Sequence, residues 1–270
     1  MVVQHNLTAM NSNRMLGITT GQQAKSAEKL SSGYKINRAG DDAAGLSISE
    51  KMRSQIRGLN KASKNAQDGV SLIQTAEGAL NEVHSILQRM NELAVQAAND
   101  TNTSADRQAL QNEITALTSE IDRVASTTQF NTKNLLDGSF TNTKLQVGAL
   151  SGQKINITIK TMDAEALSID GISVGNFSAA GSAMTLIQGA LSRVSQQRSA
   201  LGAIQNRLEH TIANLDNVSE NTQAAESRIR DTDMAAEMVE YSKNNILAQA
   251  GQSMLAQANQ ATQGVLALLQ

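Results

Sequence analysis

The residue types that most often carry chemistry are sparse and scattered in this sequence. The three histidines, His5, His84 and His210, stand far apart in the chain. A metal site or a catalytic triad needs partner ligands or bases near each histidine at fixed spacing. Neither His84 nor His210 continues as the His-Glu-x-x-His string of a zinc-protease helix. We therefore interpret the histidines as structural residues and predict no metal centre and no cofactor.

Two adjacent carboxylates, Asp41 and Asp42 in the string RAGDDAAG, are the other candidates for chemistry. An Asp before Ala-Ala-Gly-Leu is better explained as the cap of a long helix, because it accepts from free N–H groups and is favoured by the helix dipole. The absence of cysteine excludes thiol catalysis and thiolate metal sites. No GxxxxGK[ST] string is present, which excludes a P-loop. We predict that the protein is not an enzyme.

The composition favours long helices packed side by side. Among 270 residues, aromatic residues make up 2% and hydrophobic residues 40%, and both Trp and Pro are absent. Without proline, helices can continue uninterrupted. A net charge of -2 provides no basic surface for nucleic acid, and the chain has no run of apolar residues long enough to predict membrane insertion. We predict a mainly α fold, a long antiparallel helical bundle or coiled coil.

The clearest pattern is a helical run from Leu46 to Ala98. Its apolar positions are spaced alternately three and four residues apart, with one phase slip between Ile73 and Ala76. At about 1.5 Å per residue, one helix over this run would be roughly 80 Å long. Three glycines weaken it, so one helix or two collinear helices are both open: Gly58, Gly69 and Gly78.

Two further amphipathic helices are predicted, over residues 110–124 and residues 191–218. Three stripes of this kind can bury one another. Pairing of the first and last helices, which are far apart in the sequence, would bring the chain ends together.

The segment between the second and third helices changes character. Residues 154–160 alternate polar and apolar and predict a strand, with residues 145–149 as its partner across a turn at Ser151–Gly152. Residues 167–169 and 172–174 predict a second, shorter hairpin, and residues 175–182 predict a loop. We therefore expect one or two small β-hairpins between about residues 140 and 180.

The two chain ends are similar in composition. Residues 244–270 carry no charge and no proline, and the N-terminal stretch is rich in Ser, Asn and Gln. Alanine fills much of the C-terminal apolar seam, so a helix there buries little apolar area and needs partners to stay folded. We predict that the ends pair and that their apolar positions hold the pair and its partners: Leu7, Met10 and Leu30 near the N-terminus, and Met254, Ala258, Ala261, Val265 and Leu268 near the C-terminus.

Three long strings, residues 29–59, 220–238 and 244–270, closely resemble bacterial flagellin in the right order and at the right distance from each end. The resemblance covers nearly all of residues 1–138 and 188–270, and the short middle indicates a minimal member of the family. It implies a terminal coiled-coil domain of residues 1–41 and 230–270. The remaining residues, 42–229, would form a helical outer-core domain.

The resemblance also implies a function, partners and a location. The chain would polymerise with itself into the flagellar filament for swimming, and would be bound by an export chaperone, the filament cap and hook–filament junction proteins. It would be extracellular and exported without a cleaved signal peptide; the N-terminus has neither a basic nor a continuous apolar signal region. A hook–filament junction protein of the same fold and a secreted coiled-coil adhesin remain open as alternatives.

One string is similar to the segment through which flagellins are detected by Toll-like receptor 5, residues 88–96. The resemblance carries receptor recognition to Arg89, Leu93 and, from the next helix, Glu113. Arg89 and Leu93 are four residues apart and so share a helix face, where a charged group beside an aliphatic one can form a binding hot spot. The alternative is that this face packs against a neighbouring subunit.

Overall fold

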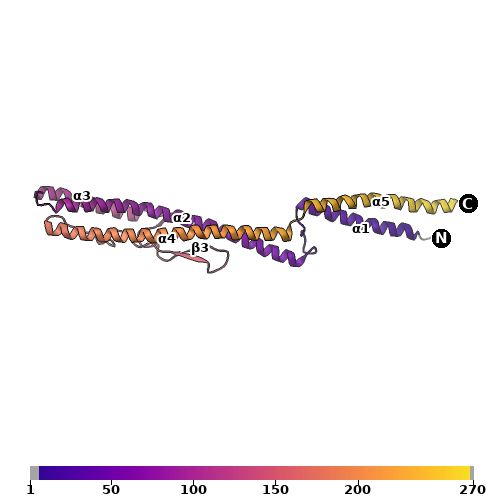
Figure 1. Ribbon diagram of the computed structural model, residues 1–270, viewed down its shortest axis with the longest axis horizontal. Coiled ribbons are helices and arrows are strands. Elements are labelled where there is room, and N and C mark those ends of the chain that lie inside the picture. Colours follow the sequence, from indigo (N-terminus) through magenta and orange to yellow (C-terminus); the bar gives the residue numbers. More distant parts are fainter. Residues whose placement is uncertain (1–5, 268–270) are drawn as a thin grey trace. The chain divides into compact units, whose positions relative to one another are not determined.

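The computed structural model describes the backbone of residues 6–267 and the side chains of residues 6–261. Within this range most residues are helical, which confirms the mainly α prediction. The helices are α1 (Leu7–Ser32), α2 (Ala43–Ala97), α3 (Ser104–Thr127), α4 (Phe177–Arg230) and α5 (Met234–Ala267) (Figure 1). The strands are β1 (Gln129–Phe130), β2 (Lys133–Asn134), β3 (Thr143–Gln146) and β4 (Lys154–Ile157). The chain divides into two compact units, the first of Met1–Ser54 with Asn221–Gln270 and the second of Gln55–Glu220.

The long helical run is one continuous helix, α2, of 55 residues. Two of the glycines in this helix have a role in packing. A Cβ on Gly58 would lie 2.9 Å from the Cβ of Ala149, and a Cβ on Gly69 would collide with the side chain of Leu145. The glycines therefore let the segment around β3 lie directly against α2.

Most of the core of the second unit lies between α2, α3 and α4. The predicted apolar positions of α2 are buried from Ile73 onward, which confirms the seam through the phase slip. Helix α3 begins at a capping box, in which Thr103 and Asp106 exchange side-chain and backbone hydrogen bonds. The large, fully buried side chains contributed by α2 and α3 are Ile73, Leu80, Leu87, Met90, Leu93, Ile114 and Ile121.

The first predicted hairpin is confirmed, but β3 is shifted from the predicted residues 145–149 and β4 ends at Ile157, three residues before the predicted end. β3 and β4 are antiparallel, with Thr143 opposite Ile157 and Gln146 opposite Lys154. The turn contains Gly152 at φ 88°, a conformation that glycine adopts without strain. The alternation of Ile155 and Ile157 was the reliable signal, because both side chains are buried under the hairpin.

The second predicted hairpin is wrong. The segment 167–174 does place its alternate apolar residues in the core, and these are Leu167, Ile169, Ile172 and Val174. Its backbone hydrogen bonds, however, close local turns or go to a side chain: Ile169 N–H donates to Ala164 O, and Val174 N–H donates to Gln111 Oε1. Alternating burial therefore arises here without hydrogen bonds between paired strands. A two-residue pair that no pattern predicted, β1 with β2, lies at the end of α3.

The predicted loop at residues 175–182 is also wrong for most of its length, because α4 begins at Phe177. The side chain of Asn176 accepts a hydrogen bond from Ala179 N–H at 2.7 Å, as an N-cap residue does. Ala180 and Ala183 are then buried against the core. Small polar residues had suggested a loop, but this stretch is a capped first turn.

In the first unit, α1 and α5 run antiparallel side by side, which confirms that the chain ends are paired (Figure 1). Asn6 Nδ2 donates to Ala258 O at 2.9 Å, and Lys29 Nζ lies 3.3 Å from a carboxylate oxygen of Glu237. The beginning of α1 therefore meets the far part of α5, and its end meets the start of α5. The helix α1 ends at Gly33, whose φ of 76° is the left-handed conformation typical of a helix C-cap.

Short segments beyond the ends of α1 and α4 join these parts of the first unit. Lys35 N–H donates to Arg230 O at 2.7 Å, and Thr232 N–H donates to Gly33 O at 3.0 Å. The guanidinium of Arg230 also lies 4.6 Å from the ring centroid of Tyr34 and 2.9 Å from a carboxylate oxygen of Glu50. That guanidinium hydrogen bond is the main cause that lowers the pKa of Glu50.

Of the two adjacent carboxylates, Asp42 has the helix-capping role that the sequence predicted, and Asp41 holds the segment before the helix. Asp42 Oδ1 accepts from Gly45 N–H at 2.9 Å at the start of α2. Asp41 pairs with Lys25 at 3.0 Å and accepts backbone N–H bonds from Asn37 and Arg38. These bonds, the Lys25 bond first, lower the pKa of Asp41 to about 2. Both aspartates hold backbone in place.

Candidate functional site

The interface between α1 and α5 contains almost no hydrophobic core. Among the described residues of the two helices, the buried ones are small or polar, namely Ser26, Asn244 and Ala248. Asn244 is 1% exposed, and neither atom of its side-chain amide has a hydrogen-bond partner. Burial of such an amide without a partner costs free energy. Apolar packing in the pair is limited to side chains that are only partly buried, such as Leu16, which lies against Gly251 of α5.

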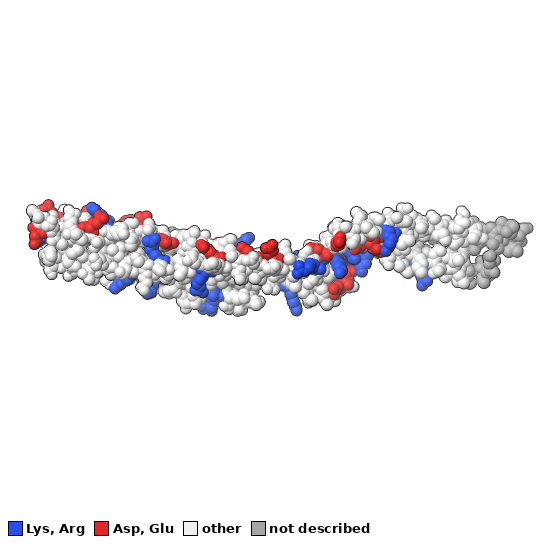
Figure 2. Space-filling view, in the orientation of Figure 1, with Lys and Arg blue, Asp and Glu red and all other residues white. Residues whose placement is uncertain are grey.

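The outer faces of the same helices carry large apolar side chains instead. We call these ten residues the terminal apolar surface: Leu7, Met10, Met15, Ile18, Met234, Met238, Val239, Ile246, Leu247 and Met254. Each is 49–71% exposed. No charged residue follows Lys243, and Arg14 is the only charge in α1 before Lys25, so much of this surface is uncharged (Figure 2). Exposed large apolar side chains that are gathered on two paired helices make this surface a candidate for an interaction site.

The residues predicted for the terminal coiled coil fall into three groups. Leu7, Met10, Met254 and Ala261 are exposed, and Leu30 and Ala258 are partly buried. The side chain of Val265 and the whole of Leu268 lie outside the described residues. Met254, at 63% exposed, therefore belongs to the terminal apolar surface and not to the seam that faces α1.

A second candidate surface lies where α2 faces α3. Arg89 of α2 forms an ion pair of 2.9 Å with Glu113 of α3, and a longer contact of 3.3 Å with Glu92. The Glu113 hydrogen bond and then the Glu92 bond raise the pKa of Arg89. The Arg89 and Glu113 side chains are 51% and 42% exposed, so the pair is available to a partner. The structure thus brings together two of the three residues predicted for receptor recognition.

Leu93, the third of these residues, is 1% exposed and belongs to the core of the second unit. It does not form the exposed aliphatic group beside Arg89 that the surface-facing string predicted. A separation of four residues places two side chains on neighbouring parts of a helix surface, but only one of these two parts is buried in the core. Val95, two residues further on, is 54% exposed.

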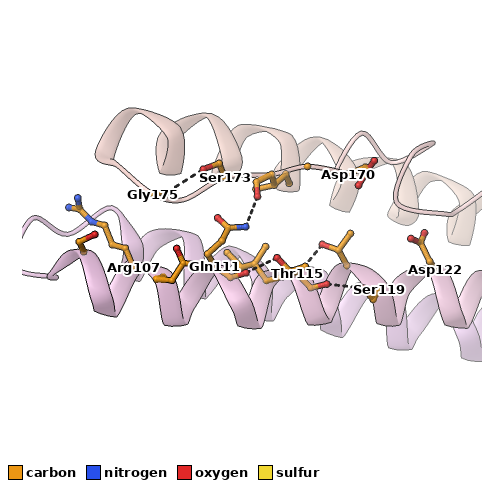
Figure 3. Close-up of a pocket in the computed structure, with 14 residues that line it drawn as sticks. Arg107, Gln111, Thr115, Ser119, Asp122, Asp170, Ser173 and Gly175 are labelled. Carbon is orange, nitrogen blue, oxygen red and sulfur yellow. Dashed lines mark hydrogen bonds between the residues drawn. The ribbon is translucent and has the colours of Figure 1, made fainter.

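An open groove of about 490 Å³ lies between α3 and the segment 170–175 (Figure 3). Gln111 spans it, because its Nε2 donates to Ile172 O and its Oε1 accepts from Val174 N–H, both at 2.8 Å. Other polar groups of the lining are engaged within their own helix: Thr115 donates to Gln111 O, and Ser119 donates to Thr115 O. Gln111 therefore holds the segment 170–175 on α3. Among the side chains that line the groove, none forms the hydrogen-bonded pair of nucleophile and general base that acyl transfer requires.

The histidines and acidic groups are not gathered either. His84 lies 3.1 Å from the amide nitrogen of Gln88 on the same helix, His210 lies beside the turn of the β3–β4 hairpin, and His5 is outside the described residues. In the part of the chain that the structure describes, no three His, Asp or Glu side chains converge as metal ligands would. Likewise, none of the described helices has the length and apolarity needed to cross a membrane.

Several residues of these surfaces were missed by the sequence reasoning. Val239, Ile246 and Leu247 precede or overlap the start of the predicted C-terminal seam and were not assigned to it. Their exposed positions become evident only once the partner helix is placed. Gln111 had no signal at all, because a glutamine in an amphipathic helix is usually a solvated residue.

Comparison with known proteins places both chain ends in one family. The family models described as the bacterial flagellin N-terminal helical region and the bacterial flagellin C-terminal helical region match residues 3–141 and 184–269. The chain is 59% identical over 271 residues to a flagellin of Halalkalibacterium halodurans and 51% identical over 303 residues to the flagellin of Bacillus subtilis, with all of each chain covered. It is also 51% identical, again over the full length of both, to a protein of Treponema maltophilum named flagellar filament 31.3 kDa core protein.

Solved structures agree with these sequence matches. A Bacillus cereus flagellin is 32% identical with a TM-score of 0.50, and the match covers 56% of this chain and 88% of that one. The structure of a putative flagellar hook-associated protein from Vibrio parahaemolyticus has a TM-score of 0.60 and covers 71% of this chain and all of that one. At 14% identity, this second likeness shows a shared fold alone.

Proposed function

The chain belongs to the bacterial flagellin family and is a structural subunit of the flagellar filament, and from this premise we propose that its terminal apolar surface is the surface through which subunits assemble. The observation that carries the proposal is the arrangement of α1 and α5: the only fully buried side chains among their described residues are small or polar, and ten large apolar side chains are exposed. A helix pair arranged in this way gains little from its own contact and much from contact with other subunits.

The same arrangement explains why assembly and folding of the ends would be coupled. Ordering a residue costs roughly 1–2 kcal/mol of backbone entropy, and the pair has few buried apolar side chains to offset this cost. We propose that the terminal segments, about residues 1–41 and 230–270, become fully ordered only when neighbouring subunits cover them. These bounds follow the ends of the elements, since α2 begins at Ala43 and α4 ends at Arg230, whereas the two compact units divide inside α2 and α4.

The remaining residues, 42–229, would form the outer-core domain, whose buried core contains the seam of α2 and does not depend on neighbours. Contacts that run head to tail and do not close into a ring produce an open helical polymer. The filament is an extracellular appendage, and the subunit would reach it through the flagellar export apparatus without a cleaved signal peptide. A chaperone that holds α5 before export, and a cap complex and junction proteins at the filament ends, complete the proposed partners.

Seeded polymerisation tests the assembly surface. A double variant, Val239→Gln with Ile246→Gln, replaces two side chains that are 71% and 66% exposed. It should keep the circular dichroism spectrum of the monomer and fail to elongate filament seeds, whereas Gln252→Ala, an exposed polar change on the same helix, should elongate them normally. Deletion of residues 244–270 should give the same loss. Filaments of normal length from the double variant would refute the assignment of this surface.

The same assay separates the two members of this fold that the sequence left open. Unmodified monomer that elongates seeds into long uniform filaments behaves as a filament subunit. Monomer that remains unpolymerised beside competent seeds would instead behave as a hook–filament junction protein, which stops growth. The full-length match to proteins named flagellin supports the first outcome.

We also propose that the free monomer is recognised by Toll-like receptor 5 through the exposed pair of Arg89 and Glu113. An exposed guanidinium that is held in place by a carboxylate can form a directional contact with a partner. Leu93 would contribute indirectly, because its burial in the core fixes the position of the helix face that carries Arg89.

A matched pair of variants tests this recognition. Arg89→Ala with Glu113→Ala should weaken receptor signalling by purified monomer. Arg123→Ala with Glu120→Ala removes a comparable exposed pair within α3, with side chains 60% and 41% exposed, and should leave signalling unchanged. Equal dose responses for the two double variants would remove Arg89 and Glu113 from the recognition site.

A further inference from the structure

The exposed methionines of this chain are concentrated in two helices. Among the described residues, five methionines are at least half exposed, and these five lie in α1 or α5: Met10, Met15, Met234, Met238 and Met254, at 64%, 51%, 50%, 53% and 63%. Elsewhere in the described chain, Met90 and Met162 are buried and Met52 and Met184 are partly covered. The concentration is notable because methionine is usually a core-filling residue.

These five thioethers make up half of the terminal apolar surface, so a reaction at sulfur would change its chemistry. Hydrogen peroxide oxidises a thioether by oxygen transfer. The sulfur lone pair attacks one peroxide oxygen, an S–O bond forms as the O–O bond breaks, and the departing hydroxide takes up the proton to leave as water. The thioether loses two electrons to the peroxide, and the product is a polar sulfoxide.

We propose that the five exposed methionines form an oxidation-sensitive site, at which peroxide converts the free subunit into a form that cannot assemble. This inference rests on the proposed assembly surface. A sulfoxide on that surface must lose its water when a neighbouring subunit covers it, and burial of a polar group without a hydrogen-bond partner is unfavourable. The change is reversible, because a methionine sulfoxide reductase transfers the oxygen to a dithiol and yields the thioether, a disulfide and water.

The site has a built-in dependence on assembly state. In the free subunit the five sulfur atoms are accessible to peroxide. In a filament, neighbours that cover the terminal apolar surface also shield the sulfur atoms. Oxidation should therefore be fast before assembly and slow after it, and Met90 and Met162 should be protected in both states because they are buried within the subunit itself.

The experiment treats purified full-length monomer and preformed filaments with the same concentration of hydrogen peroxide, followed by catalase. Peptide mass spectrometry then counts added oxygen atoms at each methionine, and seeded elongation is measured. In the monomer, oxidation should be found at the five exposed methionines and not at Met90 or Met162. The elongation rate should fall on the order of tenfold or more, because several sulfoxides would have to be desolvated at each added subunit. Filaments should show little oxidation at the same positions.

The control is a variant with all five of these methionines replaced by leucine, a change that nearly conserves volume and apolarity. Whatever its elongation rate is before treatment, peroxide should leave that rate unchanged. Repair of oxidised wild-type monomer by methionine sulfoxide reductases with dithiothreitol should also restore elongation, which provides a second test if the leucine variant does not assemble. Elongation of fully oxidised monomer at the untreated rate, or loss that the reductases do not reverse, would overturn the proposal. Untreated monomer that does not elongate the seeds would instead count against the proposed assembly function.

Discussion

The two hydrogen bonds between Gln111 and the segment 170–175 allow a prediction of how much they stabilise that segment. Replacement of Gln111 by methionine keeps the length of the side chain and removes both of its hydrogen bonds, to Ile172 O and from Val174 N–H. Val174 is fully buried and Ile172 is 7% exposed, so neither backbone group gains a full complement of water in return. A buried group left without its partner costs about 1–3 kcal/mol.

The expected loss is set by two such groups beside an open groove. Two groups at about 1–3 kcal/mol each would cost about 2–6 kcal/mol. Because Gln111 itself is only partly buried, we take the lower part of this sum, about 2–3 kcal/mol in the free energy that opens the segment. At about 1.4 kcal/mol for each factor of ten, hydrogen exchange of the segment should accelerate roughly 30- to 150-fold. The amide of Ile169 is the best reporter, because its own bond to Ala164 O, 2.9 Å long, is not touched by the substitution.

Two further variants make the test sharp. Gln108→Met, one turn earlier on α3, lines the same groove but its side chain bonds only to Asn112, so exchange at Ile169 should stay unchanged. Gln111→Glu can still accept from Val174 N–H but cannot donate to Ile172 O, and should give an intermediate acceleration. If Gln111→Met and Gln108→Met protect Ile169 equally, the segment is held by its buried side chains alone and the reasoning fails.

Three other predictions concern single side chains. Leu93→Ala should lower the free energy of unfolding by about 2–5 kcal/mol because it empties a buried site, whereas Val95→Ala should change it by less than about 0.5 kcal/mol; thermal denaturation of both monomers decides this. The pKa of Asp41 is depressed to about 2, so the stability from its bonds is present above its unfolded value and is lost as pH falls from about 4 through 2; acid titration by circular dichroism should lose this component in Asp41→Asn, and identical curves would contradict it. Asn244→Ala removes a buried amide that has no partner and should stabilise the helix pair by about 1 kcal/mol, seen as slower proteolysis of α5 in the monomer; faster cleavage would show that the amide is satisfied in solution.

Much of the fold could be predicted because its dominant signal is local. Along α2 the apolar residues repeat at helical spacing over many turns, and from Ile73 onward nearly every predicted seam position is buried. The cap at Asp42 and the strand of residues 154–157 were equally local, since each depends on a few consecutive residues. The segment 167–174 defeated the same reasoning, because alternating burial is shared by strands and by irregular segments that lie on a core.

The exposure of individual residues required the three-dimensional arrangement. Arg89 and Leu93 belong to one short string, yet one side chain is half exposed and the other is buried. Which of them is buried depends on how the neighbouring elements pack on α2, and a sequence pattern gives the stripe of a helix more accurately than its edges. The partners of Gln111 lie about sixty residues away in an irregular segment, and no periodicity connects them.

The sequence by itself determined the helices, the pairing of the chain ends and, through long matching strings, the family, because all three are recorded in local spacing and in runs of residue types. Only the tertiary structure decided that the paired ends have their large apolar side chains on the outside and an unpartnered Asn244 between them. The physical reason is that a helix with apolar residues on several faces can bury only the face that meets its partner. The faces left over, including the five exposed methionines, are defined by where that partner lies.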